Sequence, residues 1–135
     1  CSVENDRALG YLQEAFAIST REGFREGTGR SLMWQGRVYY YKDEYELAKK
    51  YFDLAEKEIT EAEDLAALVY LHFFRGETCK LRKDYINAMY HYEQVLEVSG
   101  KSPNKVISSA SYMGIGHILM ARNDPESALK YFYEG

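Results

Sequence analysis

The amino-acid sequence predicts an all-α protein built from repeated helical hairpins. Sliding the sequence against itself by forty residues aligns four alanines: Ala8, Ala48, Ala88 and Ala128. A glycine series precedes these alanines and a series of large side chains follows them, both with the same spacing: Gly36, Gly76 and Gly116, then Leu12, Phe52, Tyr92 and Phe132. Small residues beside large apolar ones on a helix face let two antiparallel helices pack closely. We therefore expect Ala48, Ala88, Gly76 and Gly116 to be buried at helix crossings.

Composition and charge narrow the class of protein. The 135 residues are 46% hydrophobic and 28% charged, which indicates one ordered domain over residues 1–135 rather than a disordered chain. Seventeen basic residues against 21 acidic ones give a net charge of -4, the wrong sign for a domain that binds nucleic acid through its phosphates. Cys1 and Cys79 are the two cysteines, too few for a disulfide framework or a thiolate zinc site.

The longest apolar stretch covers residues 65–74 and already includes His72. It is much shorter than the roughly 20 residues that span a bilayer, so we expect no membrane span. No signal-peptide pattern is visible at the start of the sequence, and we predict a cytoplasmic location. The alternative is a periplasmic lipoprotein in which Cys1 is a processed N-terminus.

Seven helices follow from the repeat. The first helix of each hairpin is expected at about 29–42, 61–81 and 103–122, and the second at about 44–59, 84–98 and from 124 to the end. The predicted hairpins therefore cover 29–59, 61–99 and 103–135. Residues 1–20 carry a further second helix, at about 4–18, from a partial repeat.

Helix-start and helix-stop residues support these boundaries. Ser102 before Pro103 and Asp124 before Pro125 are N-cap and first-turn pairs, and Thr60 with Glu63 has capping-box spacing. Gly100 suits the end of a helix.

Residues 36–55 resemble the tetratricopeptide repeat. Gly36 and Tyr39, the Glu44-Tyr45 pair at the turn, and then an alanine, an aromatic residue and another alanine follow the pattern of that family. The period of forty exceeds the usual period of about 34 residues and is similar to a longer variant found in polarity scaffolds and bacterial regulators. This resemblance implies a right-handed α-solenoid, with residues 20–28 as an extended connection between hairpins.

The resemblance also implies a concave groove lined by the first helices, which would bind a peptide or a helix. The residues placed there are Arg30, Met33, Arg37, Tyr40, Tyr41, Tyr70, Phe73, Glu77, Lys80, Met113, His117 and Met120. Aromatic and thioether side chains suit adaptable contacts with amphipathic helices or hydrophobic peptides.

For some of these residues a packing role is the alternative. Met33, Phe73 and Met113 could either contact a partner or pack between hairpins, and we expect Phe73 and Met113 to contribute to binding. The resemblance also places Trp34 and Phe74 on the groove face, but we expect both in the core, because large aromatic residues at helical spacing are usually buried.

Two arginines on the first predicted groove helix share a face. Arg30 and Arg37, seven residues apart, could receive a carboxylate or a phosphate. The alternative is solvated pairing with Glu22 or Glu26.

No set of residues predicts catalysis, a cofactor or a metal. His72, His91 and His117 fall in different predicted helices without metal-ligand spacing, and Cys79 stands in a packing column, where we expect a buried, inert thiol. The chain is thus predicted to be no enzyme.

The sequence favours a non-enzymatic module that binds a protein or peptide ligand. The alternative is a sensory or oligomerisation segment of a bacterial transcription or signalling regulator. Because the chain opens on a second helix without its partner, we expect a fragment of a longer protein. Apolar residues at its ends, Leu9 and Phe16 at one and Tyr131 at the other, predict a homo-oligomer formed by end-to-end or terminal-helix packing.

Overall fold

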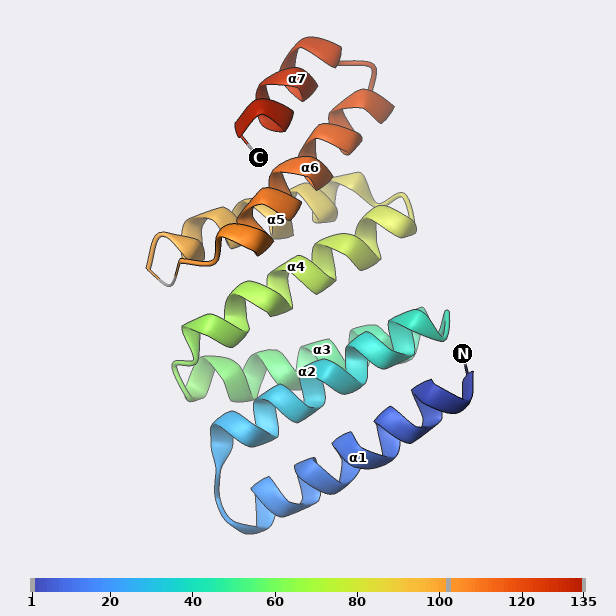
Figure 1. Cartoon of the computed structure of the whole chain (residues 1–135), viewed down its shortest axis with the longest axis vertical. Helices are drawn as coiled ribbons and strands as arrows, with labels where there is room; N and C mark the ends of the chain where they lie inside the picture. Colours follow the sequence, from blue (N-terminus) through green and yellow to red (C-terminus); the bar gives the residue numbers. More distant parts are fainter. Residues whose placement is uncertain (1, 102, 135) are drawn as a thin grey trace. The chain divides into compact units, whose positions relative to one another are not determined.

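The structure, a computed structural model, describes residues 2–101 and 103–134. Over these ranges it consists of seven helices without a strand, which confirms the all-α prediction (Figure 1). The helices are α1 (Ser2–Arg21), α2 (Arg25–Tyr41), α3 (Tyr45–Glu61), α4 (Leu65–Leu81), α5 (Tyr85–Ser99), α6 (Lys105–Ala121) and α7 (Pro125–Glu134).

Five of the six turns have one backbone conformation. In the turn after α2, Asp43 adopts a left-handed conformation with φ of 61°, the Asp43 N–H donates to the Tyr40 carbonyl, and the Glu44 N–H donates to the Tyr39 carbonyl. This pair of bonds is the Schellman motif, which satisfies the last carbonyls of a helix. Gly23, Glu63, Lys83 and Asn123 hold the same place in the other four turns.

Several predicted boundaries are wrong because of these turns. α2 begins at Arg25 rather than residue 29, so residues 20–28 are not an extended connection. Thr60 lies inside α3 and Glu63 in the turn, so the predicted capping box does not form, and α4 begins at Leu65 instead of residue 61.

Of the two helix starts predicted from a proline, the one at α7 is confirmed and the one at α6 is not. α6 begins at Lys105, with Asn104 as its N-cap, so Pro103 precedes the helix; Ser102 lies outside the described residues. α7 begins at Pro125 as expected, and the Asp124 side chain accepts a hydrogen bond from the Ser127 N–H. Gly100 is the C-cap of α5, as expected.

Contacts between Cα atoms divide the chain into two compact parts, called unit 1 (residues 1–67) and unit 2 (residues 68–135). In unit 1, α2 packs against both α1 and α3. The unit 1 core is apolar and includes Leu9, Leu32, Met33, Val38, Ala48, Phe52, Ala55 and Ile59. Removing these side chains from water is the main stabilising contribution to the unit.

Unit 2 has two clusters of buried side chains. One joins α5 and α6 through Ala88, Tyr92, Ile115 and Ile118. The other joins α4, α5 and α6 through Val69, Val95 and Ile107.

The glycine and aromatic series of the sequence meet at the helix crossings. A Cβ added at Gly36 would lie closer than 3.0 Å to the Phe52 ring, and the same holds for Gly76 with Tyr92 and Gly116 with Phe132. Ala48, Ala88 and Ala128 are fully buried. The expected close packing within each hairpin is therefore confirmed.

Candidate interaction surface

One face of α2 remains exposed after α1 and α3 have packed against the helix. Arg30, Trp34, Arg37 and Tyr41 follow one another at spacings of four, three and four residues, so they share this face. We call them the α2 stripe. Trp34 is 41% exposed and Tyr41 58% exposed. The expectation that Trp34 belongs to the core is wrong, because this side of α2 is not covered by packing within unit 1.

Arg37 is held in place by two tyrosine rings. Its guanidinium carbon lies 4.6 Å from the centre of the Tyr41 ring and 5.1 Å from that of Tyr40. An Arg37 Nη2 atom also donates a 2.8 Å hydrogen bond to the Tyr41 hydroxyl. Stacking of this kind restricts the arginine rotamers and leaves the guanidinium oriented for planar acceptors such as carboxylates.

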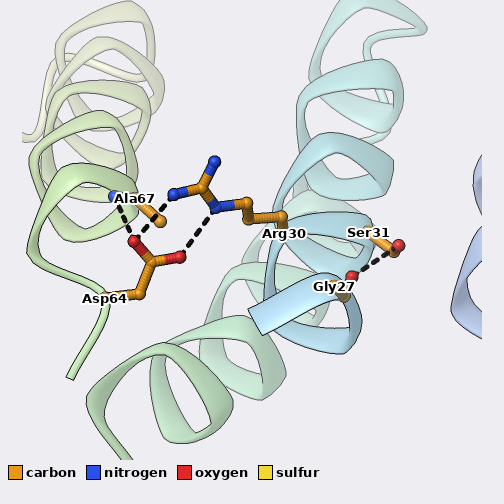
Figure 2. Close-up of polar contacts among 5 residues, drawn as sticks. All are labelled: Gly27, Arg30, Ser31, Asp64 and Ala67. Atoms are coloured by element: carbon orange, nitrogen blue, oxygen red, sulfur yellow. Dashed lines mark hydrogen bonds and ion pairs between the residues drawn. The ribbon is translucent and has the colours of Figure 1, made fainter. Parts of the chain in front are cut away.

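Arg30 is engaged by an acidic residue from the start of α4. Figure 2 shows the Arg30 guanidinium facing the Asp64 carboxylate, with Nε–Oδ2 and Nη2–Oδ1 distances of 2.7 and 2.8 Å. The hydrogen bond with Arg30 lowers the pKa of Asp64 and raises that of Arg30. Arg30 thus forms its hydrogen-bonded ion pair with Asp64, and of the two glutamates expected near it, Glu26 acts through its charge, which also raises the pKa of Arg30.

Asp64 also supports the first turn of α4. Its Oδ1 atom accepts a hydrogen bond from the Ala67 N–H at 3.3 Å, in the manner of an N-cap (Figure 2). The nearby Ser31 hydroxyl bonds back to the Gly27 carbonyl inside α2. Arg30 is consequently committed to holding α2 against the start of α4, whereas Arg37 is oriented by aromatic rings.

Met33 differs from the other predicted groove residues of α2. Its side chain is 2% exposed and belongs to the unit 1 core. The sequence left open whether Met33 contacts a partner or packs between helices. The structure shows packing, because a side chain this deeply buried is not accessible to a partner. Tyr40 is half-buried between the rings of Tyr41 and Tyr45.

α6 carries a second exposed stripe, in unit 2. Val106, Met113, His117 and Met120 lie on one face of the helix and are all exposed; we call them the α6 stripe. The His117 ring meets the edge of the Phe132 ring at a centroid distance of 5.5 Å. This surface is apolar and thioether-rich, in contrast to the cationic and aromatic α2 stripe.

The predicted groove residues of α4 are largely occupied by contacts inside unit 2. Phe73 is half-buried and its ring packs against Tyr92, while Tyr70 is half-buried against Phe74. Glu77 accepts a 2.8 Å hydrogen bond from the Tyr92 hydroxyl and lies 3.6 Å from the Lys80 ammonium. Phe74 is buried, as expected for a core residue.

The two remaining histidines form a pair between α4 and α5. The Nδ1 atoms of His72 and His91 lie 3.1 Å apart and the rings stack at 5.4 Å. Burial is the main cause that lowers the pKa of each histidine to about 4; the positive charge of Arg75 contributes to both shifts, and His72 contributes to that of His91. The pair is therefore neutral near pH 7, with one ring donating its Nδ1 proton to the other.

Other chemistry is sparse in the part of the chain that the structure describes. No group of three or more potential metal ligands comes together there. No helix among these residues is long and apolar enough to cross a membrane. The Cys79 thiol is half-buried beside the larger core cluster of unit 2, so it is less enclosed than expected.

Sequence reasoning preferred the core to the surface for Trp34, and it missed Asp64 as the partner of Arg30. A signal for Trp34 was available, since it lies on the same helical face as Arg30 and Arg37. The sequence signal for Asp64 was weaker. Asp64 accepts a hydrogen bond from the backbone N–H three residues later, that of Ala67, as Asp84 does from Asn87, so an aspartate just before a helix was the available sign.

Comparison with known proteins identifies one segment. Residues 29–58, which cover most of α2 and α3, match the tetratricopeptide repeat family. No curated protein matches the chain significantly. Repeats of this family are protein-interaction modules and are typically non-enzymatic.

Proposed function

The chain is a tetratricopeptide-repeat protein, and from this premise we propose that it binds a peptide or helix carrying acidic and aromatic side chains. The α2 stripe is the primary contact surface in this proposal. Its composition is that of interface hot spots, where tryptophan, tyrosine and arginine are enriched.

Exposure of Trp34 is the observation that carries the proposal. An indole that is 41% exposed on a helix face leaves apolar area in water, and a partner that covers it gains the free energy of burial. The adjacent Arg37 adds specificity, because its oriented guanidinium can form a bidentate pair with a carboxylate. An acidic residue next to an aromatic or aliphatic one therefore complements this surface.

The proposal can be tested by selecting binding peptides from a random displayed library on the purified chain. We expect the selected peptides to share a carboxylate within a few residues of an apolar side chain. Trp34 is the single tryptophan of the sequence, so its fluorescence reports directly on binding at the α2 stripe. Binding should shift its emission to shorter wavelength as the indole leaves water.

Variants of the stripe provide the second part of the test. Trp34→Ala and Arg37→Gln should each weaken the selected peptides by more than about fivefold, the effect of removing an interface anchor. Leu54→Ala is the matched control, because Leu54 is similarly exposed but lies on α3. Peptides that lack acidic residues, or that bind Trp34→Ala unchanged, would contradict the proposal.

A second candidate function is favoured by the α6 stripe. Val106, Met113 and Met120 expose apolar side chains together, and such a surface also suits self-association within a larger regulator. Sedimentation over a wide concentration range tests this directly. Replacing Met113 and Met120 by Glu should abolish any dimer, and a monomer at every concentration would remove this candidate.

A further inference from the structure

A stripe of exposed residues runs along α1, on the side away from its contact with α2. Its members fall within about 100° of the helix circumference. They are Val3, Arg7, Gly10, Tyr11, Glu14 and Ile18, and we call them the α1 stripe. Val3 is 66%, Tyr11 68% and Ile18 44% exposed.

The opposite face of α1 is fixed to the rest of unit 1. Leu9 on that face is buried, and α1 packs along α2 (Figure 1). At the end of α2, the Lys42 ammonium lies 2.8 Å from the Asp6 carboxylate. The α1 stripe is therefore presented to solvent by a helix whose position other contacts hold.

The α1 stripe is complementary to itself. If two copies of α1 lie antiparallel across a two-fold axis between Gly10 and Tyr11, residues equally far from that point on its two sides face each other. Arg7 of one copy then faces Glu14 of the other, and Val3 faces Ile18. At the axis itself, Gly10 faces Tyr11 of the second copy. Each contact occurs twice, so apolar meets apolar and each charge meets its opposite.

Gly10 differs from the glycines at the helix crossings. A Cβ added at Gly36 or Gly76 would collide with an aromatic ring of the same hairpin, whereas a Cβ added at Gly10 would have no described atom within 4 Å. Packing within the chain therefore does not explain a glycine here, although glycine weakens a helix. A tyrosine ring of a second copy over Gly10 would repeat the glycine–aromatic contact that joins Gly36 to Phe52.

The charges of the α1 stripe determine the direction of the second helix. Arg7 and Glu14 are exposed, and neither has an ion-pair partner among the residues that the structure describes. They stand about 10 Å apart along the helix, too far to pair with each other. An antiparallel second copy provides an opposite charge for both, whereas a parallel copy in register would place like charges together.

We propose that two copies of this chain associate through antiparallel packing of their α1 helices, with Tyr11 of each against Gly10 of the other and Arg7 of each paired with Glu14 of the other. This is the terminal-helix form of the self-association that the sequence left open. A second copy is the occupant because the symmetry of the stripe has no use in binding an unrelated partner. One helix per copy makes an interface smaller than the standard ~1,600 Å², so the dimer is expected at high concentration.

Charge reversal tests the pairing, with sedimentation equilibrium over a wide concentration range as the measurement. Arg7→Glu and Glu14→Arg each turn both ion pairs into like-charge contacts, and each should weaken the dimer at least about tenfold. A mixture of these two variants restores both opposite-charge contacts and should form a heterodimer about as strong as the dimer of the unaltered chain. Lys49→Glu reverses an exposed charge on α3 and is the matched control, which should leave the dimer unchanged.

Gly10→Leu separates dimerisation from folding. The position is open in the single chain and leucine favours a helix far more than glycine does, so this variant should melt at a higher temperature as a monomer. In the dimer the new side chain takes the place of the Tyr11 ring, and association should weaken at least about tenfold. A variant that merely damages the fold would lower the melting temperature instead.

Several results would overturn the proposal. A monomer at the highest concentration that can be reached is one of them. Another is equal dimerisation of the charge-reversed variants and the unaltered chain, or a mixture of them that stays monomeric. Association through the α6 stripe is distinguished, because it is lost when Met113 and Met120 are replaced by Glu and is kept in Arg7→Glu. Peptide binding at the α2 stripe is measured separately by Trp34 fluorescence, so the proposed function stands or fails independently of the dimer.

Discussion

Unit 1 and unit 2 differ at two positions that the forty-residue repeat makes equivalent. In unit 1 these positions line a hollow between α1, α2 and α3, and in unit 2 they hold a pair of stacked histidines. Leu32 and Tyr51 line the hollow, and forty residues later stand His72 and His91, whose rings stack on each other. Packing around the glycines is shared, since Phe52 meets Gly36 as Tyr92 meets Gly76. The repeat thus fixes the close helix crossings and leaves the positions beside them open to different chemistry.

The same contrast extends to the neighbouring polar residue. Gln35 of unit 1 is neutral at every pH, whereas Arg75 stands forty residues later and its charge lowers the pKa of both histidines. Asp84 acts in the opposite direction on His91. We therefore expect acid to destabilise unit 2 at the histidine pair, whereas the equivalent residues of unit 1 do not titrate in that range.

The largest expected effect is on the pH dependence of stability, when His72 and His91 are replaced by the leucine and tyrosine that stand at the equivalent positions of unit 1. Both pKa values lie below the ordinary 6.5, at about 4, so the stabilising contribution of the neutral pair is complete above pH 6.5 and is lost as the pH falls towards 4. For buried His72 alone the shift corresponds to about 3 kcal/mol. The double variant His72→Leu and His91→Tyr should remove most of this pH dependence.

Urea unfolding of the whole chain at pH 7, 6, 5 and 4 measures the effect. The single variant Leu32→His is the matched comparison in unit 1 and should introduce a pH dependence of the same sign. If the unaltered chain keeps its free energy of unfolding between pH 6.5 and 4, the histidines are solvated in solution and the contrast between the units disappears.

The sequence predicted the helices and their crossings well because both depend on local periodicity and on small residues opposite large ones. It predicted the start of α4 poorly. The left-handed residue of that turn is Glu63, where a glycine would have marked the end of α3, and Thr60 with Glu63 imitated a helix start.

The candidate surface was predicted only in part, because exposure depends on which helices cover a face. Trp34 and Met33 are adjacent in sequence, yet the first is exposed and the second buried. Partners for charged groups were equally hidden, since Arg30 pairs with Asp64, 34 residues away. The pairing of His72 with His91 likewise joins two helices through residues whose separation matches no motif.

A smaller effect is expected from the helix starts, where the units again differ. Asp64 is buried, pairs with Arg30 and caps α4, so Asp64→Ala should lower the free energy of unfolding by about 2 kcal/mol. Asp124 is exposed and only caps α7, and Asp124→Ala should cost about half as much. Thermal and urea unfolding of both variants at pH 7 provide the comparison.

The contribution of Asp64 to stability is lost at a lower pH than that of the histidines, so a pH series distinguishes the two. The pKa of Asp64 is lowered, so its stabilising contribution is present above pH 3.8 and is lost as the pH falls below that value. Equal costs for Asp64→Ala and Asp124→Ala would show that the ion pair with Arg30 adds nothing to the cap.

The smallest effect concerns the aromatic residue at the helix crossings, which is Phe52 in unit 1 and Tyr92 in unit 2. Tyr92 is fully buried and its hydroxyl donates to Glu77, whereas a phenylalanine has no such group. Tyr92→Phe keeps the packing against Gly76 and should cost about 1 kcal/mol, because a hydrogen bond to a partly hydrated carboxylate contributes modestly. The double variant Tyr92→Phe and Glu77→Gln should add little to Glu77→Gln alone, and urea unfolding of the three variants measures this coupling. Additive costs would mean that the hydroxyl and the carboxylate stabilise unit 2 independently, and that the two aromatic positions differ by more than a single hydrogen bond.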